Sequence, residues 1–396
     1  MATIVEIGAV EGFILDDPVA GVLDNTDYTL GGVNFTDISD KVIQIALSRG
    51  KNRDLDRFND GQLSVLVNNE DRSFDPNYAS ATYKNLVVPR RQIRVTTDSL
   101  RQFTGVVDDW NFNYTPDGKS RAEIVSTDDF TLLARQTVSA GTATEQLSGA
   151  RVSAVLDQES IAWPADRRNI DAGSSTLGTD VFQGNALEYL QDIERSEQGQ
   201  LFIGKNGDLF FRGRLDATPT SGSITTFADD GTGVPFRTVL VNYGTELLVN
   251  TASVTSDAGT ASATNSRSRT AYGISSESVE TLVSSVPQLQ NIADYIVAKY
   301  ADPEYRFSGV DLNLDNMSAP NRAAVLGLEI GDIMLIKFTP NNVGAAIEQY
   351  GQIIRVDHDI DGTRHDMTIG VSSLDFTFLV LDDAVFGKLD NNSLAF

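Results

Sequence analysis

RRQIRVTTDSLRQFTGVVDDWNFNYTPDGKSRAEIVSTDD, residues 90–129, is the stretch that decides the fold class. Apolar side chains alternate with polar ones through it, and Asp, Gly and Pro interrupt the alternation at short intervals. Its apolar runs are Ile93 with Val95, residues 103–107, Trp110 with Phe112 and Tyr114, and residues 122–125. A period of two with such turns predicts antiparallel hairpins with one face in water, because no helical period survives the turns.

Similar alternation recurs towards both ends of the chain, whereas its middle carries helical patterns. The further strand-like runs are 61–76, 307–316, 330–340 and 350–362. Three helices are predicted from apolar residues at helical spacing, at 151–157, 183–198 and 285–300. Asn206-Gly207 predicts a tight hairpin, and the Ser/Thr/Ala/Gly-rich segment 255–273 is expected to be a loop. The order is therefore β block, mixed insert, β block.

The composition excludes several classes of function. Among 396 residues, 55 are acidic, 31 are basic and none is cysteine, so the formal net charge is −24. This excess argues against a protein that grips nucleic-acid backbone, which needs clustered Lys and Arg. Without cysteine there is no disulfide scaffold and no thiolate chemistry. No apolar stretch approaches about 18 residues, and no basic region precedes the first apolar residues, so we expect neither a membrane span nor a signal peptide.

The histidines add little chemistry. His358 and His365 both lie in RVDHDIDGTRHDMTIGV (355–371), which predicts a hairpin around Asp361-Gly362. His358 could pair with Asp366 across that hairpin. No motif for nucleophilic catalysis accompanies them, and the Asp-rich segments lack the spacing of a calcium loop. We therefore expect no enzyme, no cofactor and no metal site.

Two segments near the ends of the chain are almost identical. LDDPVAGVLDN (15–25) and LDDAVFGKLDN (381–391) share the pattern L-D-D-x-V-x-G-x-L-D-N. Neither is long enough to fold alone, so each is predicted to be an arm that contacts another domain or another chain. Their apolar residues recur at four-residue spacing and are the candidate contacts: Leu15, Val19, Leu23, Leu381, Val385 and Leu389.

Several motifs, in this order, resemble tail proteins of long-tailed bacteriophages. NEDRSFDP (69–76) is similar to the turn that ends a strand in that family, and NLVVPRRQIRV (85–95) is similar to the strand that follows. Residues 103–136 resemble the family's next strand, hairpin and acidic turn. Further parts that resemble hub-type members are 186–214, 272–307 and 328–376, and L-D-D-x-V-type tails are common in such proteins.

The resemblance implies a tail-tip or baseplate hub with a mainly β (α+β) fold. Such a hub has two tube-type β-barrel or sandwich domains, a helix-containing insert and extended terminal arms. The implied division is an N-terminal arm (1–35), a first tube-type domain (36–138), a mixed α/β insert (139–233), a second tube-type domain (234–376) that includes helix 285–300, and a C-terminal arm (377–396). Nothing resembles an appended lysozyme or peptidase domain.

The resemblance also implies the setting. The chain would assemble in the host bacterial cytoplasm as a homotrimer presenting six tube domains, and would act in the virion at the tail tip. Its partners would be the distal tail protein, tail tip, spike or fibre proteins, and the tape-measure protein. DNA would pass through it without specific binding, so Asp108, Asp109, Asp128 and Asp129 are candidates for an acidic lumen. Two alternatives stay open: a distal tail protein forming a hexameric ring, and a carbohydrate-active tail enzyme.

Overall fold

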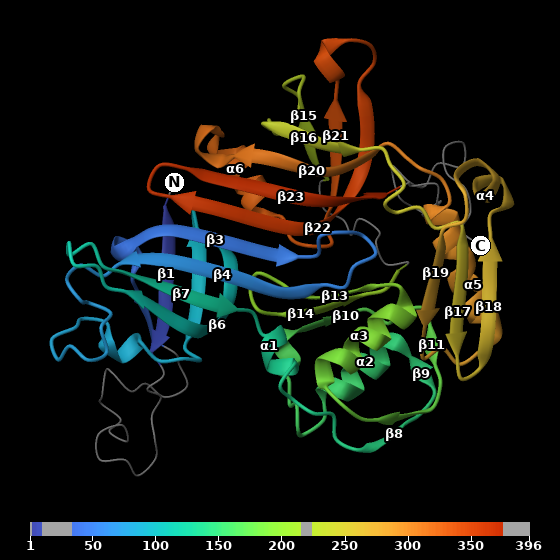
Figure 1. Cartoon of the computed structure of the whole chain (residues 1–396), viewed down its shortest axis with the longest axis horizontal. Helices are drawn as coiled ribbons and strands as arrows, with labels where there is room; N and C mark the ends of the chain where they lie inside the picture. Colours follow the sequence, from blue (N-terminus) through green and yellow to red (C-terminus); the bar gives the residue numbers. More distant parts are fainter. Residues whose placement is uncertain (1, 10–33, 215–223, 375–396) are drawn as a thin grey trace.

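The computed structural model describes residues 2–9, 34–214 and 224–374 (Figure 1). Both copies of the terminal repeat fall outside the described residues, and with them Leu15, Val19, Leu23, Leu381, Val385 and Leu389. Most of the described elements are strands, and the largest sheet contains strands from both ends of the chain. The predicted mainly β (α+β) class is confirmed. Within the described ranges, no helix is both long and apolar enough to cross a bilayer.

The first β block, blue to teal in Figure 1, is an antiparallel sheet with one buried face. Its strands are β1 (Thr3–Ala9), β2 (Asn34–Asp37), β3 (Val42–Gly50), β4 (Asn59–Asn68), β5 (Gln92–Thr97), β6 (Leu100–Asn113) and β7 (Arg121–Thr127). The alternation buries Ile45, Val65, Ile93 and Ile124 in a single core. The alternation of apolar and polar residues therefore predicted correctly which side chains of these strands are buried.

Two features of this block differ from the sequence prediction. The runs 103–107 and 110–114 were predicted as separate strands, but β6 continues through them because a bulge at Asp108 re-aligns the pairing with β7. Residues 3–9, predicted to belong to the N-terminal arm, form β1, which pairs with β5 and puts Val5 and Ile7 into the core. These residues therefore extend the sheet by pairing with the edge of β5, and their alternating apolar side chains are buried rather than part of a free arm.

The second β block, yellow-green to red in Figure 1, contributes the other part of the large sheet. Its elements are β15 (Thr225–Ala228), β16 (Thr238–Asn242), β20 (Arg306–Asn313), α6 (Ala319–Gly327), β21 (Ile333–Phe338), β22 (Ile347–Asp361) and β23 (His365–Leu374). The hairpin predicted around Asp361-Gly362 is the β22–β23 turn. β22 also pairs with β3, so both blocks form one continuous sheet.

The insert, green in Figure 1, contains the two predicted helices in its stretch of the chain. Its elements are α1 (Phe130–Leu133), β8 (Gly141–Ala143), β9 (Gln146–Leu147), α2 (Ser148–Leu156), β10 (Arg168–Ile170), β11 (Thr176–Leu177), β12 (Asp180–Phe182), α3 (Ala186–Glu197), β13 (Gln200–Ile203) and β14 (Leu209–Arg212). Asn185 caps α3 by accepting a hydrogen bond from Leu187 N at 2.9 Å. Asn206-Gly207 lies in the tight turn between β13 and β14, as predicted.

A small sheet covered by a helix stands where a loop was predicted at 255–273. It comprises β17 (Thr251–Ser256), β18 (Gly259–Thr264), α4 (Ser266–Tyr272), β19 (Ser276–Glu280) and α5 (Val286–Tyr300). Small side chains such as Ala252 and Ala261 are buried, and Ile292 and Ile296 of α5 belong to the same core. Helix α5 confirms the prediction at 285–300. The loop prediction failed because strand propensity depends on packing, which the helix supplies.

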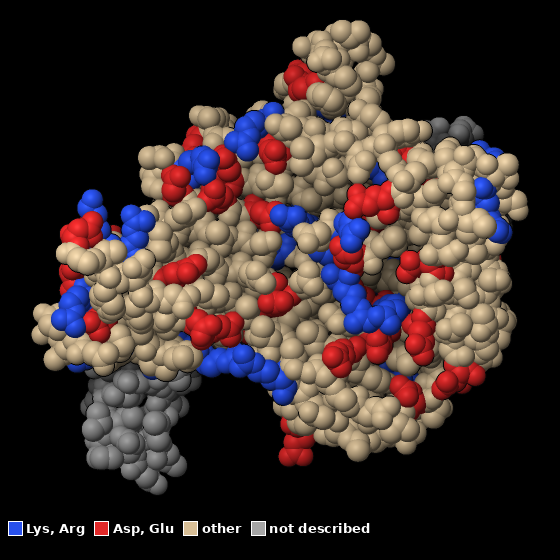
Figure 2. Space-filling view, in the orientation of Figure 1, with Lys and Arg blue, Asp and Glu red and all other residues tan. Residues whose placement is uncertain are grey.

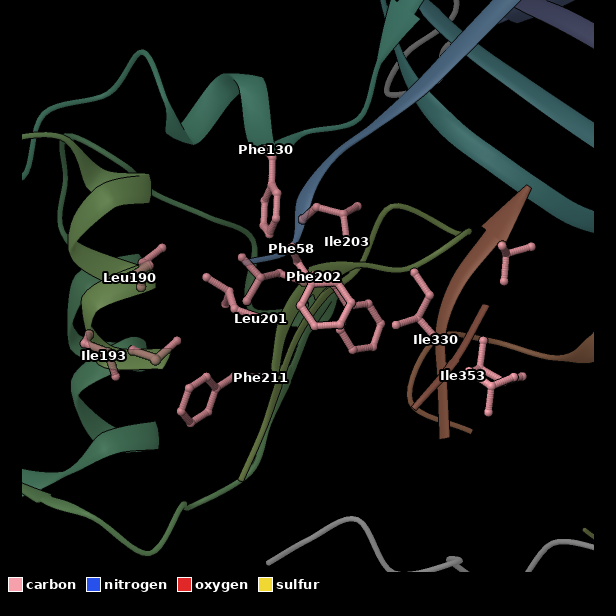
Figure 3. Close-up of a cluster of buried hydrophobic side chains, with 14 of the residues drawn as sticks. Phe58, Phe130, Leu190, Ile193, Leu201, Phe202, Ile203, Phe211, Ile330 and Ile353 are labelled. Carbon is pink, nitrogen blue, oxygen red and sulfur yellow. The ribbon is translucent and has the colours of Figure 1, made fainter. Parts of the chain in front are cut away.

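The insert shares its core with both β blocks. Figure 3 shows Phe58, from the β3–β4 connection, and Phe130 of α1 close to Phe202 of β13, with Ile330 and Ile353 of the second block on the other side. The rings of Phe58 and Phe202 lie 5.6 Å apart. Short 3-10 turns complete the described chain at Ser39–Lys41, Lys84–Leu86, Ala165–Arg167, Leu314–Asn316 and Pro340–Asn342. The shared core fixes how the two blocks sit on the insert.

Candidate functional site: a duplicated sheet and its polar face

The two β blocks contain the same arrangement of five strands. In the first block the order of neighbours is β3-β4-β7-β6-β5, and in the second it is β16-β20-β23-β22-β21. Every neighbouring pair in both series is antiparallel, and the strands follow one another along the chain in the same order. The chain therefore carries two copies of one supersecondary unit.

The correspondence holds residue by residue. The β6–β7 pairing shifts register between Val107 and Asp109, and the β22–β23 pairing shifts between Ile353 and Arg355. Aligning the two bulges superimposes Gly105 on Gly351. It also superimposes two similar closing contacts, Arg90 N donating to Val107 O at 2.7 Å and Gly331 N donating to Ile353 O at 2.8 Å. The corresponding segments FTGVVDDW (103–110) and QYGQIIRV (349–356) share only that glycine, so sequence identity gave no signal of the duplication.

The two copies join edge to edge through β3 and β22. The register runs from Arg355 opposite Gly50 to Asp361 opposite Gln44. Ile360, near the end of β22, is 8% exposed and belongs to the core of the first block. At the other end of the junction, Gly50 has φ +112°, and an added Cβ would lie 2.1 Å from Ile354 O. Only glycine allows the two strands to approach so closely there.

The histidines lie at this junction but do not pair as predicted. His358 Nδ1 is 2.8 Å from His365 Nε2, and both rings are buried. Asp366 points to the opposite face of β23, where it accepts hydrogen bonds from Arg237 and Asn313. The alternation of side chains along β23 separates Asp366 from His358, which corrects the predicted pair. Burial lowers the pKa of His365 to about 4 and that of His358 well below its ordinary value.

A buried ion pair ties the insert to the junction. Arg49 of β3 is 3% exposed, and its Nη1 donates to Glu329 Oε1 at 2.7 Å. Glu329 Oε2 also accepts from the backbone N of Lys205, in the β13–β14 turn, at 2.7 Å. Burial acts to raise the pKa of Glu329, but Arg49 and backbone donors outweigh it and hold the pKa below its usual value. The pair thus links the first block, the second block and the insert.

The face of the sheet opposite the core is polar from β16 through β6. Its side chains on β3 are Gln44, Ala46 and Ser48, all exposed. The acidic side chains of this face are Asp109, Glu123, Asp311, Asp357, Asp359, Asp361 and Asp366. The basic ones are Arg121, Arg306 and Arg355, together with Arg237 and Arg364, which pair with Asp366 and Asp359. Acidic groups therefore outnumber basic ones on a surface that spans both blocks. Figure 2 shows basic and acidic side chains close together on the surface turned to the viewer.

Two of the predicted acidic residues lie on or beside this polar face. Asp109 is exposed on β6. Asp108 occupies the bulge, where its carboxylate accepts a hydrogen bond from Thr127 Oγ1 at 2.5 Å and lies 3.8 Å from Arg90 and 3.9 Å from Arg135. The charge of Asp108 is therefore largely balanced within the subunit, whereas that of Asp109 faces solvent.

The other two predicted acidic residues are buried, which corrects their assignment to a lumen. Asp128 is 3% exposed and accepts hydrogen bonds from Gly61 N at 2.7 Å and Phe130 N at 3.0 Å. Burial raises the pKa of Asp128 to about 8. Asp129 is also buried and accepts from Arg167 at 2.7 Å. Both carboxyl groups satisfy donors where β7 turns into α1, a structural role.

The chain shares its fold with three tail proteins, two of which come from prophages. The 43 kDa tail protein of prophage MuSo2 from Shewanella oneidensis aligns with 93% of this chain and 97% of its own, at a TM-score of 0.57 and 12% identity. A tail protein from Neisseria meningitidis MC58 aligns with 95% of this chain and 97% of its own, at a TM-score of 0.61 and 9% identity. Prophage tail protein gp18 from Listeria monocytogenes EGD-e aligns with 94% of this chain and 96% of its own, at a TM-score of 0.51 and 12% identity.

No protein-family model matches the sequence, and no curated protein sequence matches it. The similarity to the tail proteins extends over nearly the whole of each chain, including the insert. The resemblance inferred from the sequence motifs is confirmed as a shared fold.

Proposed function

We propose that this chain is a structural protein of a bacteriophage tail and forms the hub ring at the tail tip or baseplate. The observation that carries the proposal is the duplicated unit, joined edge to edge in one continuous sheet. A chain with one unit builds a sixfold ring from six copies, as the alternative distal tail protein would. A chain with two units needs only three copies, and closed symmetry then satisfies every interface.

The polar face supports a role as a channel lining. In a ring built by continuing the sheet, one face lines the bore and the other packs against the insert. The buried face carries the shared core, so the polar face is the one that turns inward. Its excess of carboxylates repels phosphate, which would let DNA pass without sticking. Asp109 is the predicted lumen residue that keeps this role.

The remaining parts of the proposal concern partners and setting. The first partner is a second copy of the chain, in a homotrimer, and the expected neighbours along the tail are the distal tail protein, tip, spike or fibre proteins and the tape-measure protein. The protein would act in the virion at the tail tip after assembly in the host cytoplasm. Its role would be structural rather than enzymatic, since the buried polar groups described above, Arg49 with Glu329 and the carboxyl groups of Asp128 and Asp129, all bond within the fold.

The mass of the native assembly tests the proposal. Native mass spectrometry of the purified protein, and of tails that contain it, should give three copies per ring. Six copies per ring would favour the distal tail protein instead. A protein that stays monomeric in solution and also on the tail would overturn the ring altogether. An assembly whose bore is net positive would remove the role proposed for the polar face.

A further inference from the structure

We propose that the free edge of β6 in one copy of the chain pairs antiparallel with the free edge of β16 in the next, and that Tyr114 enters the neighbour's core. The inference rests on the proposed ring and specifies which strands and residues close it. It follows from the duplication, because the junction inside the chain shows how one unit docks on the other.

Both edges are open in the described part of the chain. β5 pairs with β6 only up to Val106, and beyond the contacts of Val107 no described strand lies on that side of β6. β16 is the terminal strand of the sheet, with only β20 beside it among the described strands. β6 corresponds to β22, and β16 corresponds to β3. Pairing β6 with a neighbour's β16 therefore repeats the β22–β3 junction between chains.

The duplication also fixes the register. Asn113 corresponds to Asp359, because each lies four residues beyond the bulge residue Asp109 or Arg355. Leu240 corresponds to Ala46, since each is opposite the equivalent residue of β20 or β4. Within the chain, Asp359 lies directly opposite Ala46. Asn113 of one copy is therefore expected opposite Leu240 of the next.

The same alignment places Tyr114 opposite Val239. Their counterparts are Ile360 and Ile45, which pair across the internal junction and are both buried in the first block's core. Tyr114 is 51% exposed in the single chain; its ring stacks on Phe112 with centroids 6.1 Å apart, and its hydroxyl hydrogen-bonds with Asp75. An exposed aromatic side chain that continues a buried row is an unfilled contact.

The exposed surfaces of the two edges are compatible. Leu240 is 44% exposed on the polar face of β16, and Val239 packs partly against the core on the other face. On β6, Asn111 and Asn113 are exposed on the polar face, with no like charge to oppose the neighbour. Main-chain hydrogen bonds would supply the attraction, as in other strand additions, and Tyr114 would supply the apolar anchor.

Cysteine cross-linking tests the register directly, because the chain has no cysteine of its own. Asn113→Cys combined with Leu240→Cys should, on mild oxidation, convert the protein into covalent trimers that a reducing agent returns to monomers. Residues directly opposite in antiparallel strands have Cα atoms about 4.5–5.5 Å apart, within the range of a disulfide.

Two matched variants calibrate the result. Ala46→Cys with Asp359→Cys probes the equivalent pair inside the chain and should lose its free thiols while remaining a monomer on a denaturing gel. Asn111→Cys with Leu240→Cys keeps both strands and the same face but is two residues out of register, so its cross-linking should be much weaker. Equal cross-linking of Asn111 and Asn113 would overturn the proposed register.

Tyr114→Asp supplies a second readout that needs no disulfide. The substitution should abolish the trimer in native mass spectra while circular dichroism still shows a folded monomer, with a lower thermal midpoint because the hydrogen bond with Asp75 is lost. Tyr272→Asp, at a tyrosine that is 47% exposed on α4, is the control and should leave the trimer intact. A trimer that persists in Tyr114→Asp and does not cross-link through Asn113 and Leu240 overturns this inference but leaves the ring standing. A chain that never trimerises overturns both.

Discussion

Replacing Gly50 by alanine should open the junction between the two β blocks. Gly50 has φ +112°, a conformation that an L-residue rarely adopts. The new Cβ would lie 2.1 Å from Ile354 O and 2.7 Å from Arg355 Cα. Both obstacles are backbone atoms of β22, so they can move only if the β3–β22 ladder shifts.

The expected cost follows from two contributions. Holding alanine at a positive φ costs about 1 kcal/mol. Forcing a methyl group into a packed site costs a further 1–3 kcal/mol or so. Gly50→Ala should therefore lower the free energy of unfolding by roughly 2–4 kcal/mol. Gly118→Ala is the matched control, because Gly118 has φ +80° but no atom within 4 Å of its added Cβ, so that only the first contribution, about 1 kcal/mol, applies.

Urea unfolding at pH 7 measures the difference between the two variants. Hydrogen exchange then locates it, because the amide of Lys51, which donates to Ile354 O at 2.9 Å, should lose protection in Gly50→Ala and keep it in Gly118→Ala. If Gly50→Ala costs no more than Gly118→Ala, the close approach of β3 to β22 does not hold the blocks together and the reasoning fails.

Three further changes test other parts of the structure. Burial lowers the pKa of His365 to about 4, below the value of about 6.5 expected in the unfolded chain, so the unfolded state binds more protons between these values. The contribution of His365 to stability should therefore fall by about 3 kcal/mol from pH 7 to pH 4, and urea unfolding should show this as a difference of about that size between the pH dependence of the original protein and that of His365→Gln. Asp128→Asn leaves one acceptor oxygen for two backbone donors, so it should lower the free energy of unfolding by about 1–3 kcal/mol in the same assay. Asp109→Asn, at an exposed position, should lower it by less than about 0.5 kcal/mol, and equal effects of the two changes would contradict the argument from burial. Deleting 377–396 should leave the circular-dichroism melt of the body unchanged and weaken assembly measured by native mass, and unchanged assembly after removal of both terminal repeats would refute their role as arms.

Local patterns in the sequence were sufficient wherever neighbouring residues decide the structure. Alternation at 90–129 predicted the strands, helical spacing predicted α3 and α5, and Asn206-Gly207 predicted its hairpin. Each of these depends on contacts within a few residues, which the backbone geometry of strands, helices and tight turns determines directly.

Only the tertiary structure decided how these pieces meet. The β3–β22 pairing joins residues about 300 positions apart, and no local pattern specifies such a partner. The sequence predicted that Asp128 and Asp129 form an exposed acidic run, yet both are buried, where a backbone N–H and Arg167 donate hydrogen bonds to them. The strands at 251–280 consist of small polar and apolar residues whose structure depends on the cover that α5 provides. Burial and register are set by partners distant in sequence, which is why the sequence determined the elements of this protein and the packing alone determined its duplicated sheet.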